Sequence, residues 1–371
     1  MKNVIIGAGV FGLATALSFR EALEDVTIIE CGFPNTASRS ALGRLDPILK
    51  GAGSAGHLSD QEQALSGPLK PENQKKLALE SFLRHKSNYK KLVELSGIDY
   101  YLEDIPTIQV CFDEDEFSSI EDSQEEMQSL GFNVKTTQDY KEIESYQEGI
   151  SSEIFGIALI TGSLFLDANL FISCMRKSAE TLGAKIINDF VEELFHKDKQ
   201  LRLKSGEIID YENLIICAGP WTNQLISSTG ETVDMFPAKG EIIKLESSQI
   251  SINNHLHGPC SVVKKRDGLI WIGATYEDEI FDSNITLEAE SKLINDASLM
   301  LPILSNQKVV EHTACVRPAT KDGMPRVGEL IQNSGIFVAT GGGGWGIMQS
   351  FLIGDLLKNL VIDEVPSLYP L

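Results

Sequence analysis

The chain has 371 residues, and its 53 acidic side chains against 32 basic ones give a formal net charge of −21. Such an acidic surface repels phosphate groups, which disfavours general nucleic-acid binding and a polybasic membrane anchor. The length suffices for a substantial hydrophobic core and exceeds what one core usually holds, so two domains are expected.

The first thirty residues predict one βαβ unit. Residues 2–6 predict a short buried strand, residues 7–12 a glycine turn, and residues 13–22 a helix with apolar side chains at helical spacing. Residues 26–30 predict a second buried strand. Its β-branched side chains are typical of a parallel strand that is covered on both faces.

The next hundred residues give weaker signals. Residues 32–68 are rich in Gly, Ser and Ala and predict loops. A helix is predicted over residues 77–96, and strands within residues 100–111. The dense acidic run over residues 113–126 is typical of a solvated helix face or a loop.

The remaining chain alternates between two kinds of pattern. Helices are predicted over residues 170–182 and 347–360. Strands are predicted over residues 185–187, 200–203, 207–210, 213–219, 241–245, 261–264, 269–273 and 336–340.

Pieces typical of a dinucleotide-binding fold therefore stand at the start, around residues 185–220 and at the end, with antiparallel-looking strands between them. This interleaving predicts a mixed α/β (α+β) protein with two discontinuous domains. A Rossmann-type cofactor domain is expected over residues 1–75, 150–230 and 313–371. A substrate-binding domain built on an antiparallel sheet is expected over residues 76–149 and 231–312.

Cysteine usage and hydropathy bear on location. The six cysteines form no CxxC pair, which is typical of a reducing compartment rather than of a disulfide framework or a zinc site. No metal-ligand cluster stands out, so no metal is expected. No signal peptide precedes the strand at Val4, and no apolar run approaches the ~20 residues of a spanning helix. We therefore expect a cytoplasmic protein without an integral membrane segment.

The first motif is Gly7-x-Gly9-x-x-Gly12, which follows a strand, opens a helix and has Glu30 at the end of the next strand. This context is typical of adenine-dinucleotide binding. Gly7 permits the tight turn, Gly9 lets the backbone approach the pyrophosphate, and Gly12 lets helix and strand pack closely. Glu30 can accept hydrogen bonds from the ribose hydroxyls. The motif alone does not distinguish FAD from NAD.

Two further motifs are "RPATKDGMPRVG" over residues 317–328 and the glycine run over residues 341–346. Together with the first motif, they resemble the D-amino acid oxidase superfamily of flavoproteins, above all glycine oxidase and then D-amino acid dehydrogenase. The resemblance covers nearly the whole chain in the family's order, including "NLIICAGPW" over residues 213–221 and "GAT" over residues 273–275. The part of the resemblance that distinguishes this family from other flavoproteins is "RPxTxDGxP" over residues 317–325.

The resemblance implies a Rossmann-type FAD-binding domain, a second antiparallel-sheet domain and non-covalent FAD. It places Arg317 against the substrate carboxylate, a role that suits a guanidinium because its fork matches a carboxylate bidentately and keeps its charge. It also places the glycine run and the following helix against the flavin ring. The implied cofactor contacts are Val10, Phe11, Ser38, Arg39, Gly43, Arg44, Leu45, Val191, Ala218, Gly219, Trp221, Arg317, Gly342, Gly343, Gly344, Trp345, Gly346 and Ile347.

Two departures from the glycine oxidase pattern concern the substrate. Ser261 stands where glycine oxidase has a tyrosine, and Tyr276 stands where it has a methionine. We therefore expect these two residues to set specificity, and the substrate not to be simply glycine. Cys315 resembles the flavin attachment position of monomeric sarcosine oxidase, but the residues after it follow glycine oxidase, so no covalent link is expected. His255 and His257 are either surface residues or neighbours of the site.

The function implied is FAD-dependent oxidation of the C–N bond of a small amino acid of the glycine, N-methylglycine or D-amino acid class. Hydride would pass from Cα to flavin N5, and the imino acid would hydrolyse to an oxo acid and ammonia or an amine. Oxygen or another acceptor would take the electrons, and homo-oligomer formation is left open. The alternatives are a tRNA-modifying FAD oxidoreductase acting on a carboxymethylaminomethyl group, a 2-hydroxy-acid oxidoreductase of the same fold, and a non-catalytic FAD-binding protein.

Overall fold

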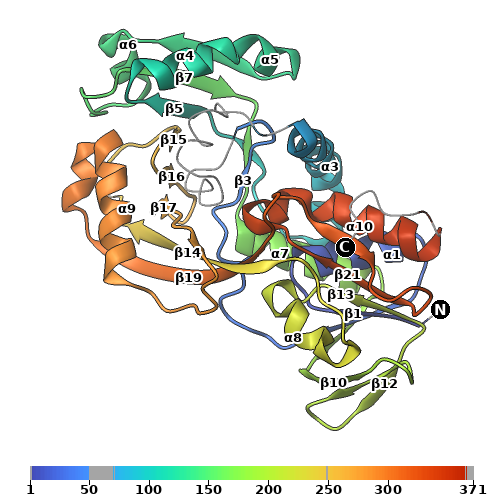
Figure 1. The fold of residues 1–371 in the computed structure, drawn as a ribbon. Coiled ribbons are helices and arrows are strands. Elements are labelled where there is room, and N and C mark those ends of the chain that lie inside the picture. Colours follow the sequence, from blue (N-terminus) through green and yellow to red (C-terminus); the bar gives the residue numbers. More distant parts are fainter. Residues whose placement is uncertain (1, 50–69, 71, 248–249, 364, 366–371) are drawn as a thin grey trace.

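Two large sheets organise the chain, with helices packed against each of them (Figure 1). The computed structural model describes residues 2–49, 70, 72–247, 250–363 and 365. The mixed α/β fold class predicted from the sequence is confirmed. Among the described residues, no helix combines the length and the apolar character needed to cross a membrane.

The first sheet has six strands in the order β20-β21-β13-β1-β2-β9. Its strands pair in parallel, except that β20 runs antiparallel to β21. The central strand β1 is buried at every position, which explains its run of apolar residues. The strands are β1 (Asn3–Ile6), β2 (Val26–Glu30), β9 (Lys185–Asn188), β13 (Asn213–Ile216), β20 (Arg326–Glu329) and β21 (Ile336–Thr340).

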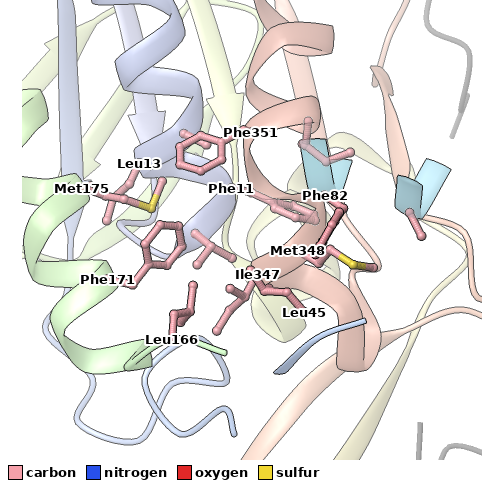
Figure 2. Close-up of a cluster of buried hydrophobic side chains, with 14 of the residues drawn as sticks. Phe11, Leu13, Leu45, Phe82, Leu166, Phe171, Met175, Ile347, Met348 and Phe351 are labelled. Carbon is pink, nitrogen blue, oxygen red and sulfur yellow. The ribbon is translucent and has the colours of Figure 1, made fainter. Parts of the chain in front are cut away.

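Four helices pack together beside this sheet: α1 (Val10–Glu21), α3 (Glu72–Ser96), α7 (Ala168–Thr181) and α10 (Gly346–Ile362). Figure 2 shows their shared core, in which Leu13 of α1, Phe171 of α7 and Phe351 of α10 point toward one another. All three side chains are buried. The helix that follows the first glycine turn is thus held against the last helix of the chain.

The second sheet has nine strands, with β18-β14-β17-β16-β15-β5-β7-β6 in order and β19 paired to β14. Apart from the parallel pair β15–β5, its strands run antiparallel. The strands are β5 (Thr107–Cys111), β6 (Asn133–Thr137), β7 (Gly156–Thr161), β14 (Phe236–Leu245), β15 (His255–His257), β16 (Ser261–Lys264), β17 (Ile270–Gly273), β18 (Glu277–Asp278) and β19 (Val309–Ala319).

Helices also flank the second sheet. Helix α9 (Leu287–Met300) packs against β14 and β17, while α4 (Glu114–Asp122), α5 (Gln124–Ser129) and α6 (Tyr140–Tyr146) lie at its far end (Figure 1). The acidic run near residue 120 thus forms helices. It buries Phe117, Ile120 and Met127 and leaves most of its carboxylates in solvent.

Shorter elements complete the fold. One three-stranded sheet consists of β10 (Val191–Phe195), β11 (Gln200–Leu203) and β12 (Ile208–Asp210), and another of β3 (Arg44–Leu45), β8 (Leu164–Phe165) and β4 (Glu103–Asp104). Within the described residues, the remaining helical turns are α8 (Thr222–Ile226), η2 (Gly219–Trp221), η3 (Ser227–Thr229), η4 (Pro302–Asn306) and η5 (Gly343–Trp345). Strand β3 lies within the predicted loop of residues 32–68, whose residues 50–68 are outside the described part of the chain.

Candidate active site

A cavity of about 1520 Å³ runs from the carboxyl ends of β1, β2, β13 and β21 to the faces of β14 and β19. It gathers nearly all the residues that the sequence singled out. The lining includes Gly7, Gly9, Val10, Phe11, Glu30, Ser38, Arg39, Gly43, Arg44, Val191, Ala218, Gly219, Trp221, Ser261, Tyr276, Arg317, Gly342, Gly343, Gly344, Trp345, Gly346 and Ile347.

Two of the predicted cofactor residues do not line this cavity. Gly12 lies inside α1, beside the Gly7 carbonyl. Leu45, the second residue of β3, is fully buried in the hydrophobic core. Any contribution of these two residues to cofactor binding is therefore indirect. Gly12 lets α1 pack against the glycine turn, and Leu45 supports the cavity wall from the core.

The first glycine turn presents backbone N–H groups to the cavity. Gly7 has a φ of +106°, and a Cβ there would overlap the Cys217 carbonyl oxygen, so only glycine fits this turn. Helix α1 begins directly after Gly9, which provides no side-chain cap. The amide of Val10 donates to Ser38 Oγ at 3.2 Å. Because Gly9 has no side chain to cap the helix, the amides that follow Val10 are suited to a phosphate group.

Glu30 ends β2 at the cavity wall, where the motif predicts a ribose partner. Its carboxylate also forms an ion pair with Arg176 of α7, which limits its rotation. Because a carboxylate accepts several hydrogen bonds, this pairing leaves room for ribose hydroxyls, and that role stays a prediction.

The C-terminal glycine run brings a second helix start to the same cavity. Helix α10 begins at Gly346, and its N-cap residue Trp345 makes no side-chain capping bond. The Trp345 ring lies under the Lys70 ammonium, whose Nζ is 3.9 Å from the ring centre. The positive ends of α1 and α10 therefore face one cavity, an arrangement that favours negative charge at two separate points.

Arg317 reaches the cavity from β19. Alternate residues of the β14–β19 pair line the cavity, namely Thr313, Cys315 and Arg317 on one strand and Gly240 and Ile242 on the other. Arg317 Nη1 donates to the carbonyls of Lys239 and Thr275, each at 3.3 Å. These two bonds fix the guanidinium while leaving other N–H groups for a ligand.

Gly240 was not predicted to be a site residue, yet the Arg317 position depends on it. The guanidinium lies directly over its Cα, so that a Cβ at this position would overlap the guanidinium carbon and both terminal nitrogens. A glycine inside a strand is a known mark of close approach by another group, but the predicted strand begins at residue 241 and leaves Gly240 outside it.

The two residues predicted to set specificity both line this cavity. The Arg317 Cζ is 5.4 Å from the centre of the Tyr276 ring. Burial raises the pKa of the Tyr276 phenol, although the Arg317 charge opposes this, so the hydroxyl remains a donor at neutral pH. Ser261 lies opposite Gly273 in the β16–β17 pair, and its Oγ is 3.2 Å from His257 Nδ1.

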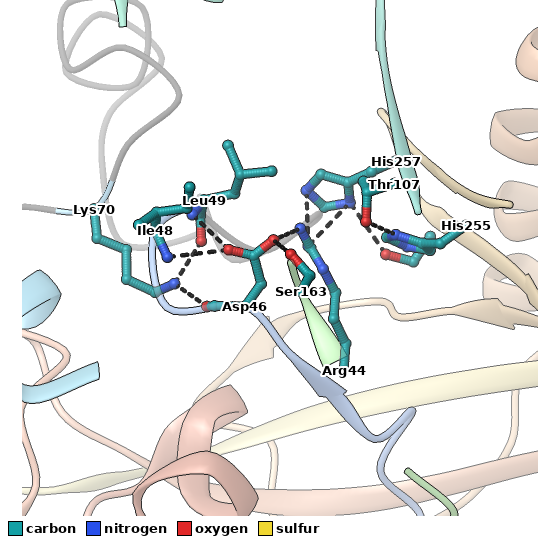
Figure 3. Close-up of polar contacts among 10 residues, drawn as sticks. Arg44, Asp46, Ile48, Leu49, Lys70, Thr107, Ser163, His255 and His257 are labelled. Atoms are coloured by element: carbon teal, nitrogen blue, oxygen red, sulfur yellow. Dashed lines mark hydrogen bonds and ion pairs between the residues drawn. The ribbon is translucent and has the colours of Figure 1, made fainter. Parts of the chain in front are cut away.

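A buried ionic cluster forms the wall beside Ser261 (Figure 3). Arg44 Nη2 donates to Asp46 Oδ2 at 2.7 Å. Burial by itself raises the pKa of Asp46, but Arg44, Lys70 and hydrogen bonds lower it to about 2. Burial lowers the pKa of Lys70 to about 7, against the attraction of Asp46. Its Nζ donates to the carbonyls of Asp46 and Leu49, at 2.5 and 2.6 Å.

Both histidines that the sequence left open are buried on β15. Arg44 Nη1 lies 3.1 Å from Nε2 and 3.3 Å from Nδ1 of His257. His255 Nδ1 contacts Thr107 Oγ1 at 3.1 Å, and burial keeps the pKa of this histidine well below its usual value. The surface alternative is therefore wrong for both residues. Within the described residues, no group of three or more His, Cys, Asp or Glu side chains could hold a metal ion.

The sequence matches the family of FAD dependent oxidoreductases over residues 2–360. The chain belongs to this family. It is accordingly an oxidoreductase, and its cofactor is FAD. The predicted resemblance to the D-amino acid oxidase superfamily is thus confirmed.

Similar proteins support the same assignment. Glycine oxidase from Bacillus subtilis is 24% identical over 367 residues, which cover 98% of this chain and 93% of the relative. The crystal structure of glycine oxidase from Geobacillus kaustophilus matches with a TM-score of 0.85 at 24% identity, covering 99% of this chain and 96% of that one. Iminodiacetate oxidase from Chelativorans matches with a TM-score of 0.84 at 20% identity, covering 100% and 97%.

The cavity suits the family's cofactor. It is long enough to connect the helix starts of α1 and α10, and its glycines leave backbone amides uncovered at both. The N-terminus of α1 would hold the FAD pyrophosphate, and the N-terminus of α10 would face the flavin ring. The Cys315 thiol is buried, which raises its pKa and keeps it protonated, as expected for a cysteine that is not a nucleophile.

Proposed function

We propose that this oxidoreductase oxidises the C–N bond of a small amino acid whose carboxylate is held by Arg317. The observation that carries the proposal is the guanidinium itself. It lies on the sheet face that lines the FAD cavity and is fixed by two backbone carbonyls, with no carboxylate partner among the described residues. A fixed cation of this kind is suited to bidentate capture of a carboxylate.

The substrate domain would then orient the molecule rather than supply acid–base groups. Arg317 would hold the carboxylate, and the Tyr276 hydroxyl would donate to the same group or to a polar neighbour. The sheet face around Ile242 would exclude water from Cα. Positioning of this kind contributes several kcal/mol to such reactions. In this proposal residues 1–75, 150–230 and 313–371 chiefly bind FAD, and residues 76–149 and 231–312 chiefly shape the substrate pocket. Strand β19, which pairs with β14 in the second sheet, brings Arg317 into that pocket.

The chemistry that FAD supplies when bound is a two-electron oxidation. The substrate loses a hydride from Cα and a proton from the amine, and the imino acid adds water to yield an oxo acid and ammonia or an amine. The electrons pass on to oxygen, giving peroxide, or to another acceptor. Such chemistry depends on positioning more than on a dedicated general base.

Two kinds of relative support the substrate class. Glycine oxidases and an iminodiacetate oxidase, which are similar to this chain over nearly its whole length, act on small molecules with an amine beside a carboxylate. The net charge of −21 makes tRNA a poor alternative substrate.

Anaerobic mixing of the yellow holoenzyme with single substrates tests the proposal. Glycine, sarcosine, iminodiacetate, D-amino acids, proline and 2-hydroxy acids would each be added, and flavin absorbance followed. Bleaching by an amine substrate is expected, with release of the matching oxo acid. Bleaching by 2-hydroxy acids alone would overturn the proposal in favour of that alternative. Peroxide formation in air would then identify oxygen as an acceptor.

A further inference from the structure

We propose that the substrate carries a second acidic group, which Arg44 and Ser261 hold at the end of the cavity away from Arg317. The inference rests on the proposed amino-acid oxidation and adds to it the class of substrate, an amino acid with two acidic groups. Four features of the cavity wall carry it.

The first feature is that both arginines serve the same cavity. Arg44 lines it from β3, and Arg317 lines it from β19. Ser261 is level with Gly273 and Ile242 in the sheet, while the Arg317 guanidinium lies over Gly240, two residues along β14. Ideal strand spacings put Ser261 and Gly240 roughly 12 Å apart. One small molecule with an acid at each end can span such a distance.

The second feature is that Arg44 has binding capacity left. Its side chain is 8% exposed, and its two terminal nitrogens carry four N–H groups between them. The guanidinium contacts among the described residues are Nη2 with Asp46 and Nη1 with His257 (Figure 3). These contacts leave at least one terminal N–H for a ligand, and a carboxylate oxygen would accept from it.

The third feature is an excess of positive charge. Arg44 is a permanent buried cation, Lys70 adds a second positive charge to the extent that its pKa of about 7 leaves it protonated, and Asp46 is the one anion in contact with them among the described residues. Asp46 is already saturated. Its Oδ1 accepts from the amides of Ile48 and Leu49, and its Oδ2 from Arg44 and Ser163. Because buried charge is stable only when it is balanced, this wall favours an anionic ligand.

The fourth feature is the space and the hydroxyl at Ser261. Its Oγ lies 3.2 Å from His257 Nδ1, and the same histidine contacts Arg44, so one ring positions both groups. A serine here occupies far less volume than the tyrosine of glycine oxidase. The wall therefore has room for a ligand group, together with a guanidinium and a hydroxyl that can bond it.

Matched substrate pairs give the test. Each diacid would be compared with a neutral analogue of similar size: D-glutamate with D-glutamine, D-aspartate with D-asparagine, and iminodiacetate with its monoamide. We expect kcat/KM of the wild-type enzyme to favour at least one diacid ten- to hundredfold, since the second contact is charge-assisted. Glutarate, which has no amine to oxidise, should also raise the thermal midpoint of the holoenzyme more than butyrate does.

Variants then locate the contact. Arg44→Gln should reduce the diacid preference, taken as the ratio of kcat/KM for a diacid to that for its neutral analogue at equal flavin content, to near unity. The single variant leaves the Asp46 carboxylate buried without the Arg44 cation and could destabilise the fold. The double variant Arg44→Gln/Asp46→Asn removes both charges and is assayed in the same way. Arg44→Lys should retain part of the preference.

The outcomes separate the two proposals. The enzyme could oxidise neutral amino acids as well as diacids, and glutarate and butyrate could raise its thermal midpoint equally. That result would overturn the proposal of a second acidic group and leave the proposed function intact. A diacid preference that survives in both Arg44→Gln forms would also overturn it, because the contact would lie elsewhere. Failure of every amine substrate to bleach the flavin would overturn both.

Discussion

Replacing Gly240 by alanine should disable Arg317 without altering it. Gly240 is not among the residues with positive φ, so alanine adopts its backbone conformation without strain. The added Cβ would occupy the space of the guanidinium carbon and both terminal nitrogens. The Arg317 side chain must therefore leave the position in which it donates to Lys239 and Thr275.

The size of the effect follows from the contact that is lost. A hydrogen-bonded contact between charged groups is worth roughly 1.5–3 kcal/mol, so displacement of the guanidinium should lower kcat/KM by roughly ten- to 150-fold. Most of the change should appear in KM, because the carboxylate is bound before and during the reaction. Steady-state kinetics on the best amino-acid substrate give the number. Flavin content, measured by absorbance, should match that of the wild type.

A double-mutant cycle supplies the control. If Gly240→Ala acts through Arg317, it should change kcat/KM no more than about twofold in an Arg317→Ala background, because the interaction is already absent. Near-normal kinetics in Gly240→Ala would show that the Arg317 guanidinium can bind the substrate carboxylate from another position. Fully additive losses would show that the two residues act independently and would refute the reasoning.

Further predictions concern the flavin, the specificity and the ionic cluster. Acid precipitation should release the yellow cofactor, and Cys315→Ser should not change the amount released; a flavin that stays in the wild-type pellet and is lost in the variant would contradict this. Tyr276→Phe and Ser261→Tyr should each change the ranking of substrates by kcat/KM, and an unchanged ranking in both would show that specificity is set elsewhere. The Asp46 carboxyl has a folded pKa of about 2 against an ordinary 3.8, so it should contribute about 2 kcal/mol to the free energy of unfolding above pH 4 and lose this as the pH falls toward 2. Urea unfolding of wild type and Asp46→Asn at several pH values should show the difference shrinking with acidity, and a constant difference would refute it.

Some parts of the fold could be predicted because the residues that specify them lie close together in the sequence. The β1–α1–β2 unit follows from a strand of β-branched residues, a glycine turn and helical spacing, all within thirty residues. Arg317, Tyr276 and Ser261 were found through motif resemblance, and the structure brings all three to one cavity. Their roles toward substrate remain predictions.

The buried ionic cluster was not predictable, because its members come from distant parts of the chain. Arg44 and Asp46 stand in a stretch that reads as a loop, and their partners Ser163 and His257 are more than one hundred residues away. No periodic pattern marks such a contact, since the pairing of β3 with β8 and of β15 with β5 decides it. Gly240 was missed for a local reason, because the predicted strand begins one residue after it whereas β14 spans Phe236–Leu245.

The strand order of the six-stranded sheet also governs how the chain matures during synthesis. Strand β1 is made first, but its neighbour β13 follows about two hundred residues later. At ribosomal rates of about 5–20 residues per second, that interval lasts roughly 10–40 s. Throughout it, an apolar strand edge lacks its partner and can pair with other chains. Because β21 and the glycine run come later still, the cavity that they line is complete only near the end of translation.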